Sequence, residues 1–423
     1  MIDDAAEDAS RLDASRASFD EVLDEIASCD AARFDAALHA VAWDRGWPLD
    51  AGAGDGRWLF ATRLDEGARS VSVVGDFEGW DESRLPATRC DATRWFVVVD
   101  AADVTTATGS KYKWYVADDG SYRAPAEATQ YGFDGFGRFG WVRAPLDQPH
   151  LEQFPDFRSA HLAEPRAFRA FVPTGFVAGS SGAAHARTLL LHDGQNVFHP
   201  DAFFGGWHVD DALRARGDDV IAIAVDNASD RMDAYTQVVD DIGSGTIGGR
   251  ADDYLALLED EALPFFRARY GIVARGASLM VAGSSLGGLI TLVAAERDFA
   301  AMGCGAALSS TVGWGSIDPS ARSHTSLVET WTGLHAPLYL DTGGGVNGSC
   351  LDADADGLED DGDDADNYCV NQQFLGVLER AGYEPGRTLE RAWEPDAPHN
   401  EAAWAGRIGE ALDACAAMGW RAP

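Results

Sequence analysis

The sequence predicts an α/β protein. Its domain of mostly parallel sheet, residues 160–423, follows an N-terminal helical segment (1–50) and a small β-sandwich (57–145). Two observations predict this class. Apolar strand-like runs alternate with helix-like segments after residue 160, which is typical of a parallel sheet covered on both faces. The run 220–225 is continuously apolar, as a strand buried on both faces should be.

The N-terminal segment is expected to be helical, because Phe19, Val22 and Ile26 recur at helical spacing among acidic residues. The Gly- and Asp-rich stretch 46–56 then indicates a linker. The sandwich follows, with apolar and aromatic runs separated by turn residues. Its predicted strands are 58–61, 71–74, 95–99 and 111–116.

The α/β domain is expected to carry one long amphipathic helix, 251–270, between its second and third strands. A Gly-rich stretch, 242–249, precedes that helix and is expected to form a loop at the mouth of a site. The predicted strands are 187–191, 220–225, 279–282, 305–308 and 337–340.

The strand 279–282 leads into the most informative motif, Gly283-Ser284-Ser285-Leu286-Gly287, which reads G-x-S-x-G. A serine on a sharp strand-to-helix turn needs small neighbours, because its backbone is strained and larger residues would clash. The helix N-terminus that follows can help to bind an oxyanion. The motif therefore predicts Ser285 as a nucleophile, with Ser284 pointing away from the apex of the turn.

Further motifs surround this turn in a fixed order. They are 190–198 (LLHDGQNVF), 207–210 (WHVD), Asp226-Asn227 with Arg231 and Tyr235, Ser309-Ser310 with Trp314, and His399-Asn400-Glu401 with Trp404 and Arg407. Together they resemble the enterochelin esterase-like branch of the α/β-hydrolases. In the sandwich, 73–80 (VVGDFEGW) followed by 112–114 resembles the immunoglobulin-like N-terminal domain of enterochelin-type esterases. The resemblance implies an α/β-hydrolase fold and a serine esterase that works through an acyl-enzyme.

A serine hydroxyl needs a base to remove its proton, and this fold orders the triad as serine, acid, histidine. His399 lies in a loop before the final helix, where the base belongs, so it is the predicted base. Counting back from the expected helix 372–381 favours Asp366 as the acid. The alternative acids are Asp352, Glu359 and Asp341. The resemblance also allows a Ser–His pair that acts without an acid.

The oxyanion is expected to bind the backbone N–H of Leu286 and an N–H of the Gly194-Gln195 turn. His192 is a further candidate, although it could instead buttress this turn through hydrogen bonds. The residues with a predicted substrate-binding role are Asn227, Arg231 and Trp314. Asn227 and Arg231 could equally well brace the turn after the second strand.

An insertion at 350–369 reads D-x-D-x-D-G-x-x-D-x-x-D from Asp352 to Asp363. Alternating oxygen ligands, with glycine at the sixth position, permit a sharp turn that lets the ligands converge on Ca²⁺. The loop resembles the calcium loops of dockerins and thrombospondin type 3 repeats. Without a cation the cluster repels itself, and the alternative is a solvated acidic loop. The predicted ligands are Asp352, Asp354, Asp356, Leu358, Asp360 and Asp363.

Six cysteines permit three disulfides. Cys350 and Cys369 bracket the acidic loop and form the best pair. Cys29–Cys90 and Cys304–Cys415 would be the leftover pairs, and the sequence leaves the pairing of these four cysteines open. Calcium and the Cys350–Cys369 bond are together expected to order the segment that presents Asp366, unless Asp366 is itself a calcium ligand. Disulfides and a calcium loop suit an oxidising setting, so a periplasmic or secreted protein is expected.

The formal net charge of −36 argues against nucleic acid and anionic membrane as partners, since both are also negative. No apolar run approaches membrane-spanning length. The start, Met1-Ile2-Asp3-Asp4, has no hydrophobic signal core, so either export is absent or a leader is removed. The sequence carries no signal for the oligomeric state.

The sequence thus predicts hydrolysis of a small-molecule or glycan carboxylic ester. A siderophore ester, an acylated or feruloylated carbohydrate and a generic short ester all stay open, although the net charge disfavours a highly anionic ferric siderophore complex. The alternatives are a non-catalytic carbohydrate- or surface-binding protein on a hydrolase scaffold, and an acyltransferase. A sugar platform, or equally a sandwich core, could be built from Trp80, Trp95, Trp114 and Tyr122.

Overall fold

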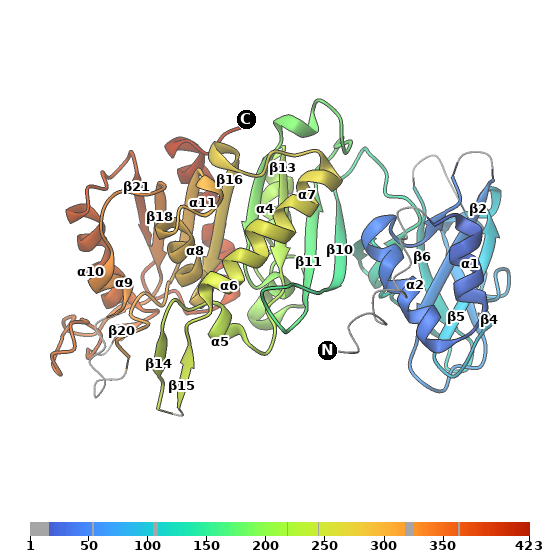
Figure 1. Cartoon of the computed structure of the whole chain (residues 1–423), viewed down its shortest axis with the longest axis horizontal. Coiled ribbons are helices and arrows are strands. Elements are labelled where there is room, and N and C mark those ends of the chain that lie inside the picture. The colour runs from blue at the N-terminus through green and yellow to red at the C-terminus, as the bar shows by residue number, and fades with distance from the viewer. Residues whose placement is uncertain are drawn as a thin grey trace, which may run out of the picture. The chain divides into compact units, whose positions relative to one another are not determined.

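The computed structural model describes residues 17–52, 55–104, 109–217, 219–243, 245–317, 325–362 and 364–423. The chain divides into two compact units, Met1–Asp156 and Phe157–Pro423 (Figure 1). Among the described residues, no helix has both the length and the apolar character that crossing a membrane requires.

The first unit begins with two helices where the sequence predicts one helical segment. α1 (Phe19–Ala27) starts with a capping box at Ser18, and α2 (Ala31–Asp44) starts at Asp30, whose carboxylate accepts two backbone N–H bonds. Cys29, with φ of 56°, separates the two helices. It forms a disulfide with Cys90, one of the three predicted pairs.

All four predicted strands of the first unit form. One sheet has the order β1-β2-β5-β4, and the other strands follow the order β10-β8-β9-β6-β3, with β7 paired to β6. The bounds are β1 (Leu49–Asp50), β2 (Arg57–Arg63), β3 (Val71–Gly75), β4 (Thr88–Arg89), β5 (Arg94–Asp100), β6 (Lys111–Val116), β7 (Ser121–Arg123), β8 (Gln130–Asp134), β9 (Gly137–Trp141) and β10 (His150–Phe157), with the short helix α3 (Ala101–Val104). The relation to immunoglobulin-like domains stays a prediction.

β2 is buried on both faces, which explains its continuous apolar sequence. Trp58 and Phe60 pack in the core between the two sheets, whereas Leu59 and Ala61 pack in the core formed with α1 and α2. Trp95 and Trp114 lie in the same intersheet core and are only 1% exposed. A sugar platform that includes these two tryptophans is therefore wrong, because their rings form the sandwich core.

The second unit is an α/β sheet with the strand order β21-β18-β17-β16-β12-β13-β11. Neighbouring strands are parallel, except that β11 runs antiparallel to β13. The bounds are β11 (Arg166–Val172), β12 (Arg187–Leu191), β13 (Val220–Val225), β16 (Leu279–Ser284), β17 (Cys304–Leu308), β18 (Leu338–Thr342) and β21 (Leu389–Trp393). The five predicted strands are confirmed, and β11 and β21 add to them.

Helices cover both faces of this sheet (Figure 1). α6, α7 and α8 lie on one face, while α4 and α11 contact each other on the opposite face. The bounds are α4 (Val209–Arg216), α5 (Arg231–Ala234), α6 (Ala251–Ala256), α7 (Leu263–Tyr270), α8 (Leu286–Glu296), α9 (Leu327–Thr330), α10 (Tyr368–Arg380) and α11 (Glu401–Met418). Two small hairpins complete the unit, β14 (Val239–Asp241) with β15 (Thr246–Gly248) and β19 (Gly345–Val346) with β20 (Asp364–Ala365).

The predicted helix 251–270 forms, with an irregular middle. A π-helical turn, η5 (Leu257–Ala262), joins α6 to α7. Pro264, in the first turn of α7, has no backbone N–H to continue an α-helical ladder, which accounts for the irregularity.

The second unit contains the two other predicted disulfides. Cys304–Cys415 joins the start of β17 to α11, and Cys350–Cys369 joins the acidic insertion to the first turn of α10. Three disulfides in one chain suggest an oxidising environment outside the cytoplasm.

Candidate active site

Ser285 occupies a strained turn between β16 and α8. Its backbone has φ of 56° and ψ of −124°, a conformation that non-glycine residues rarely adopt and that clusters at functional sites. The turn needs glycine at position 283, because an added Cβ there would lie 2.3 Å from the carbonyl oxygen of Gly287. Ser285 N–H donates to the carbonyl of Leu308 at 3.0 Å, which ties the turn to β17. The geometry is that of the turn predicted from the motif.

The turn after β12 packs against the start of α8. An added Cβ at Gly287 would lie 3.4 Å from His192 Cβ and 3.2 Å from Asp193 Oδ2. Leu286 is the first residue of α8, and the first N–H groups of a helix have no partner within it. Because β12 and β16 are parallel neighbours, the Gly194-Gln195 turn and Leu286 lie at the same edge of the sheet.

His192 lies behind this turn rather than on the surface. It is 2% exposed, and its Nδ1 is 2.8 Å from the hydroxyl of Tyr254. Burial lowers the pKa of His192 to about 4, so its ring is neutral at pH 7. These contacts agree with the buttressing role.

Asp366 and His399 meet directly. His399 Nδ1 lies 2.6 Å from Asp366 Oδ1, and the Asp366 side chain is fully buried whereas that of His399 is 35% exposed. The ring of His399 also packs edge-on against Trp404. Of the four candidate acids, Asp366 is thus the one that contacts the predicted base.

Ser309 and Arg407 hold the second oxygen of Asp366. The Ser309 hydroxyl donates to Asp366 Oδ2 at 2.6 Å and accepts hydrogen bonds from Trp404 Nε1 and Arg407 Nη2, each at 3.0 Å. Gly343 N–H donates to the same carboxylate oxygen. Both oxygens of the carboxylate therefore have hydrogen-bond partners within the protein.

Asp341 is a second buried carboxylate next to this group. Its Oδ2 lies 3.2 Å from Arg407 Nε and accepts a hydrogen bond from the hydroxyl of Tyr339. Arg407 also reaches Asp366 Oδ2 at 3.8 Å and is only 5% exposed. Burial raises the pKa of Asp341 to about 7, although Arg407 opposes the increase. Asp341 is thus paired with Arg407, whereas His399 is paired with Asp366.

The raised pKa of Asp341 predicts a pH-dependent stability. The folded state favours the protonated carboxyl of Asp341. The stabilisation of the fold by this group is therefore complete below about pH 4 and is lost as the pH rises to about 7. We therefore expect Asp341→Asn, which keeps a neutral side chain, to gain thermal stability relative to the wild type between pH 4 and 7. Thermal unfolding of both proteins across this range measures the difference between their Tm values. A Tm difference that does not change with pH would contradict a raised pKa for Asp341.

Asp366 is presented by the base of the acidic insertion. The hairpin of β19 and β20 closes the insertion, and Asp366 follows β20 directly, with φ of 63°. Asn367, also at positive φ, donates from Nδ2 to the carbonyl of Ser309 and precedes α10. The insertion therefore determines where the carboxylate lies.

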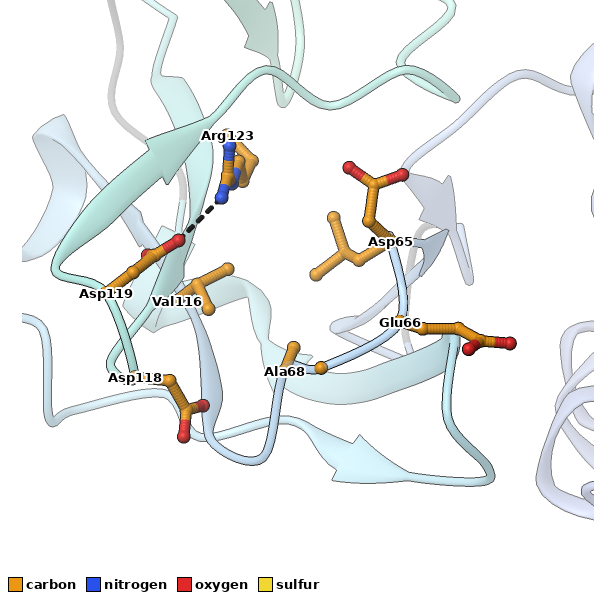
Figure 2. A pocket seen from close by; sticks show the side chains of 9 residues that line it. Asp65, Glu66, Ala68, Val116, Asp118, Asp119 and Arg123 are labelled. Atoms are coloured by element: carbon orange, nitrogen blue, oxygen red, sulfur yellow. Dashed lines mark hydrogen bonds and ion pairs between the residues drawn. The ribbon is translucent and has the colours of Figure 1, made fainter.

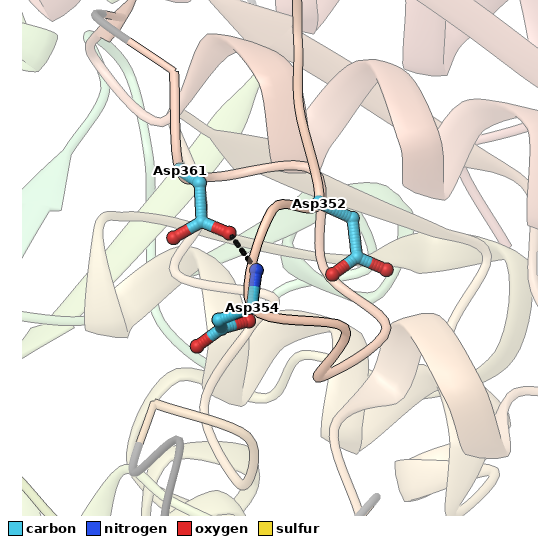
Figure 3. Close-up of side chains that lie close together, drawn as sticks. All are labelled: Asp352, Asp354 and Asp361. Carbon is cyan, nitrogen blue, oxygen red and sulfur yellow. Dashed lines mark hydrogen bonds between the residues drawn. The ribbon is translucent and has the colours of Figure 1, made fainter.

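The acidic loop brings together a set of carboxylates that differs from the predicted one. Asp352, Asp354 and Asp361 each offer an oxygen atom within 4.8 Å of the others, and all three residues are exposed (Figure 3). Asp361 was not among the predicted ligands. Asp356 is 6% exposed and accepts the N–H of Leu358, while Asp360 lies outside the three-residue set. Asp363 lies outside the described residues.

The predicted substrate-binding residues make bracing contacts. Arg231 donates to both carboxylate oxygens of Asp193, at 2.8 and 2.7 Å, and Asn227 Nδ2 donates to the same side chain. Trp314 is 2% exposed, and its Nε1 donates to the carbonyl of Val238 beneath the β14–β15 hairpin. Substrate contact by these residues stays a prediction.

A cavity of about 270 Å³ lies in the first unit and contains none of the predicted site residues (Figure 2). Its only cationic lining residue, Arg123, is paired with Asp119 at 2.6 Å. The other charged lining residues are Asp65, Glu66 and Asp118.

Comparisons with known proteins bear on the family and on the fold. Residues 159–341 match the family model described as Putative esterase, a range that includes Ser285 but neither Asp366 nor His399. Among curated proteins, a 1,4-alpha-glucan branching enzyme from Pseudoalteromonas atlantica is 38% identical over 66 residues. That match covers 16% of this chain and spans only 8% of the branching enzyme.

Solved structures of esterases are also similar. The ferric enterobactin esterase of Salmonella typhimurium is 15% identical, with a TM-score of 0.41, over 86% of this chain and 94% of that one. The enterobactin esterase of Shigella flexneri, solved with enterobactin, is 16% identical, with a TM-score of 0.43 and the same coverage. The siderophore hydrolase EstA of Aspergillus nidulans is 17% identical, with a TM-score of 0.43, over 62% of this chain and 94% of that one.

The family match covers the strained serine turn and most of the parallel sheet described above. The second unit therefore matches the Putative esterase family model over residues 159–341 and has the mixed α/β architecture described above.

Proposed function

We propose that this protein is a serine esterase that hydrolyses a carboxylic ester through an acyl-enzyme, with Ser285, His399 and Asp366 as its triad. One observation carries the proposal. The fully buried carboxylate of Asp366 lies 2.6 Å from His399 Nδ1. The strained Ser285 turn follows β16 at the same edge of the parallel sheet, which is where α/β folds place their sites.

The contacts support distinct roles for the three residues. With Nδ1–H directed at Asp366, His399 is held in the tautomer whose Nε2 is free to accept the proton of Ser285. Ser285 Oγ then attacks the ester carbonyl, and the N–H groups of Leu286 and the Gly194-Gln195 turn stabilise the oxyanion. His399 returns the proton to the leaving alcohol. Water, activated in the same way, cleaves the acyl-enzyme.

A p-nitrophenyl ester series of increasing acyl length tests the proposal. Hydrolysis with an initial burst of p-nitrophenol, in proportion to the enzyme, is expected if an acyl-enzyme accumulates. Adding an alcohol acceptor separates the alternatives, because an acyltransferase would form the new ester in preference to the free acid. Absence of turnover across the whole series would instead favour a non-catalytic binding protein.

We also propose that the insertion 350–369 binds Ca²⁺. Three carboxylate oxygens, from Asp352, Asp354 and Asp361, can approach one ion, and oxygen ligands of this kind suit calcium. The disulfide Cys350–Cys369 and the β19–β20 hairpin connect this loop to Asp366. Millimolar calcium and three disulfides would fit a periplasmic or secreted protein.

Removal of calcium is expected to lower both thermal stability and esterase activity. Calcium at about 100 times its Kd should raise the Tm of the second unit by roughly 5 °C, because it binds only the folded loop. The combined variant Asp354→Asn/Asp361→Asn should lose this increase, whereas Glu359→Gln, in the same loop but outside the set, should keep it. Thermal unfolding with EDTA and with added Ca²⁺ measures the effect. Unchanged Tm and activity would contradict the proposal.

A further inference from the structure

Two adjacent phenylalanines are exposed in the second unit, close to His399 in the fold. Phe203 is 75% exposed and Phe204 is 71% exposed, and their ring centroids are 6.4 Å apart. Single exposed apolar side chains are common, but a pair of large rings facing solvent adds nothing to the stability of the fold. Such a pair therefore points to a ligand.

The turn that carries the two rings is ordered by its own contacts. Phe204 has φ of 53° and ψ of 28°, which is unfavourable for a bulky residue and persists only where the surroundings impose it. Gly206, two residues after Phe204, has φ of 72°, and an added Cβ there would lie 2.9 Å from the carbonyl oxygen of His199. His208 Nε2 lies 2.7 Å from the carbonyl of Gly205. The rings are thus presented by a fixed turn.

This turn borders the segment that carries His399. An added Cβ at Gly205 would lie 3.2 Å from Ala402 Cβ, in the first turn of α11, which begins two residues after His399. Asn196 Nδ2 donates to Glu401 at 2.9 Å. Below the surface, Trp207 packs against Trp404, whose ring packs against His399. The turn that carries the exposed rings is therefore packed against the segment that carries His399.

We propose that Phe203 and Phe204 form a subsite for the leaving alcohol of the ester, and that this alcohol carries an uncharged apolar or aromatic group. The inference rests on the proposed esterase function. His399 must deliver a proton to the oxygen of the leaving alcohol, so the alcohol lies on the His399 side of Ser285. The carboxylate of Asp201, two residues before Phe203 in the chain, disfavours an anionic group.

Two substrates that carry the same ring on opposite sides of the ester test the subsite. 2-Naphthylmethyl acetate has the ring on the alcohol, and ethyl 2-naphthylacetate has it on the acyl group. Ethyl acetate is the reference, because its alcohol lacks the ring and has a similar intrinsic reactivity. The wild type is expected to have kcat/KM for 2-naphthylmethyl acetate about 10- to 50-fold above that for ethyl acetate, as burial of one aromatic face would provide.

The double variant Phe203→Ser/Phe204→Ser is expected to lose this preference through KM, with kcat unchanged. Its kcat/KM for ethyl acetate and for ethyl 2-naphthylacetate should stay within about twofold of the wild type. Phe136→Ser is the matched control, because Phe136 is 91% exposed in the first unit, and it should keep the preference. An equal loss with both naphthyl esters, or no loss with either, would overturn the subsite. Absence of turnover of all three esters and of the p-nitrophenyl esters by the wild type would instead overturn the esterase proposal.

Discussion

Replacing Ser285 by alanine is expected to lower kcat for ester hydrolysis by roughly 10⁶-fold, because the triad acts as a unit and the acyl-enzyme cannot form without its hydroxyl. The fold should be unaffected, since the turn is held by backbone contacts, among them Ser285 N–H to the carbonyl of Leu308. Steady-state hydrolysis of a p-nitrophenyl ester measures kcat, and thermal unfolding checks the fold.

Ser284→Ala is the matched control for this variant. Ser284 is the last residue of β16 and is only 5% exposed, so its hydroxyl is one residue away in the chain but does not share the strained apex. The kcat of Ser284→Ala is expected to stay within about tenfold of that of the wild type. Equal losses in the two variants would mean that the turn, and not the Ser285 hydroxyl, is what the reaction needs.

Asp366→Asn should have the second-largest effect, a decrease in kcat on the order of 10⁴-fold. An asparagine in this position can donate to His399 and so hold the ring in the wrong tautomer. Ser309 and Gly343 both donate hydrogen bonds to the second oxygen of Asp366, which favours an asparagine that keeps its oxygen there and turns its amide toward His399. The decrease in kcat should exceed any change in KM, because His399 acts in the transition state.

Asp341→Asn is the control that separates the contact with His399 from the loss of any buried carboxylate near the site. Asp341 is as buried as Asp366 and shares Arg407 with it, but it does not contact His399 in the structure. A decrease in kcat of less than about tenfold is expected. If Asp341→Asn were the more damaging variant, the acid of the triad would be Asp341, at the end of β18.

Much of the second unit could be predicted from local sequence. The strands of the parallel sheet are apolar because they are buried on both faces, and all five were found in order. β21 was missed because it is an edge strand whose charged residues, Glu390 and Arg391, interrupt the apolar pattern. The break between α1 and α2 was missed because apolar spacing continues across Cys29.

The candidate site was predictable to the extent that each residue carries a local signal. Ser285 has the glycines of its turn, and His399 has the loop before the last helix. Asp366 could be predicted only by counting back from a helix, because the acidic insertion holds many aspartates and no local pattern distinguishes Asp366 from the others. Its position depends on contacts across the fold, including the hydrogen bond from Ser309 in another segment.

Arg407 and the acidic loop show the same limit. A single arginine in a helix gives no sign that it is 5% exposed and lies between two carboxylates. The spacing of aspartates indicated a ligand set without Asp361, whose carboxylate lies near those of Asp352 and Asp354 in the folded loop. Side chains that are adjacent only after folding are not visible in a local pattern.

The most direct test of the proposed mechanism is covalent labelling by a fluorophosphonate probe, followed by mass spectrometry of the digested protein. Fluorophosphonates react with a serine only when a base activates it. The mechanism predicts one labelled peptide, modified at Ser285, with labelling lost in Ser285→Ala and strongly slowed in His399→Ala. No labelling of the wild type, or labelling that persists in Ser285→Ala, would contradict the proposal that Ser285 is the nucleophile.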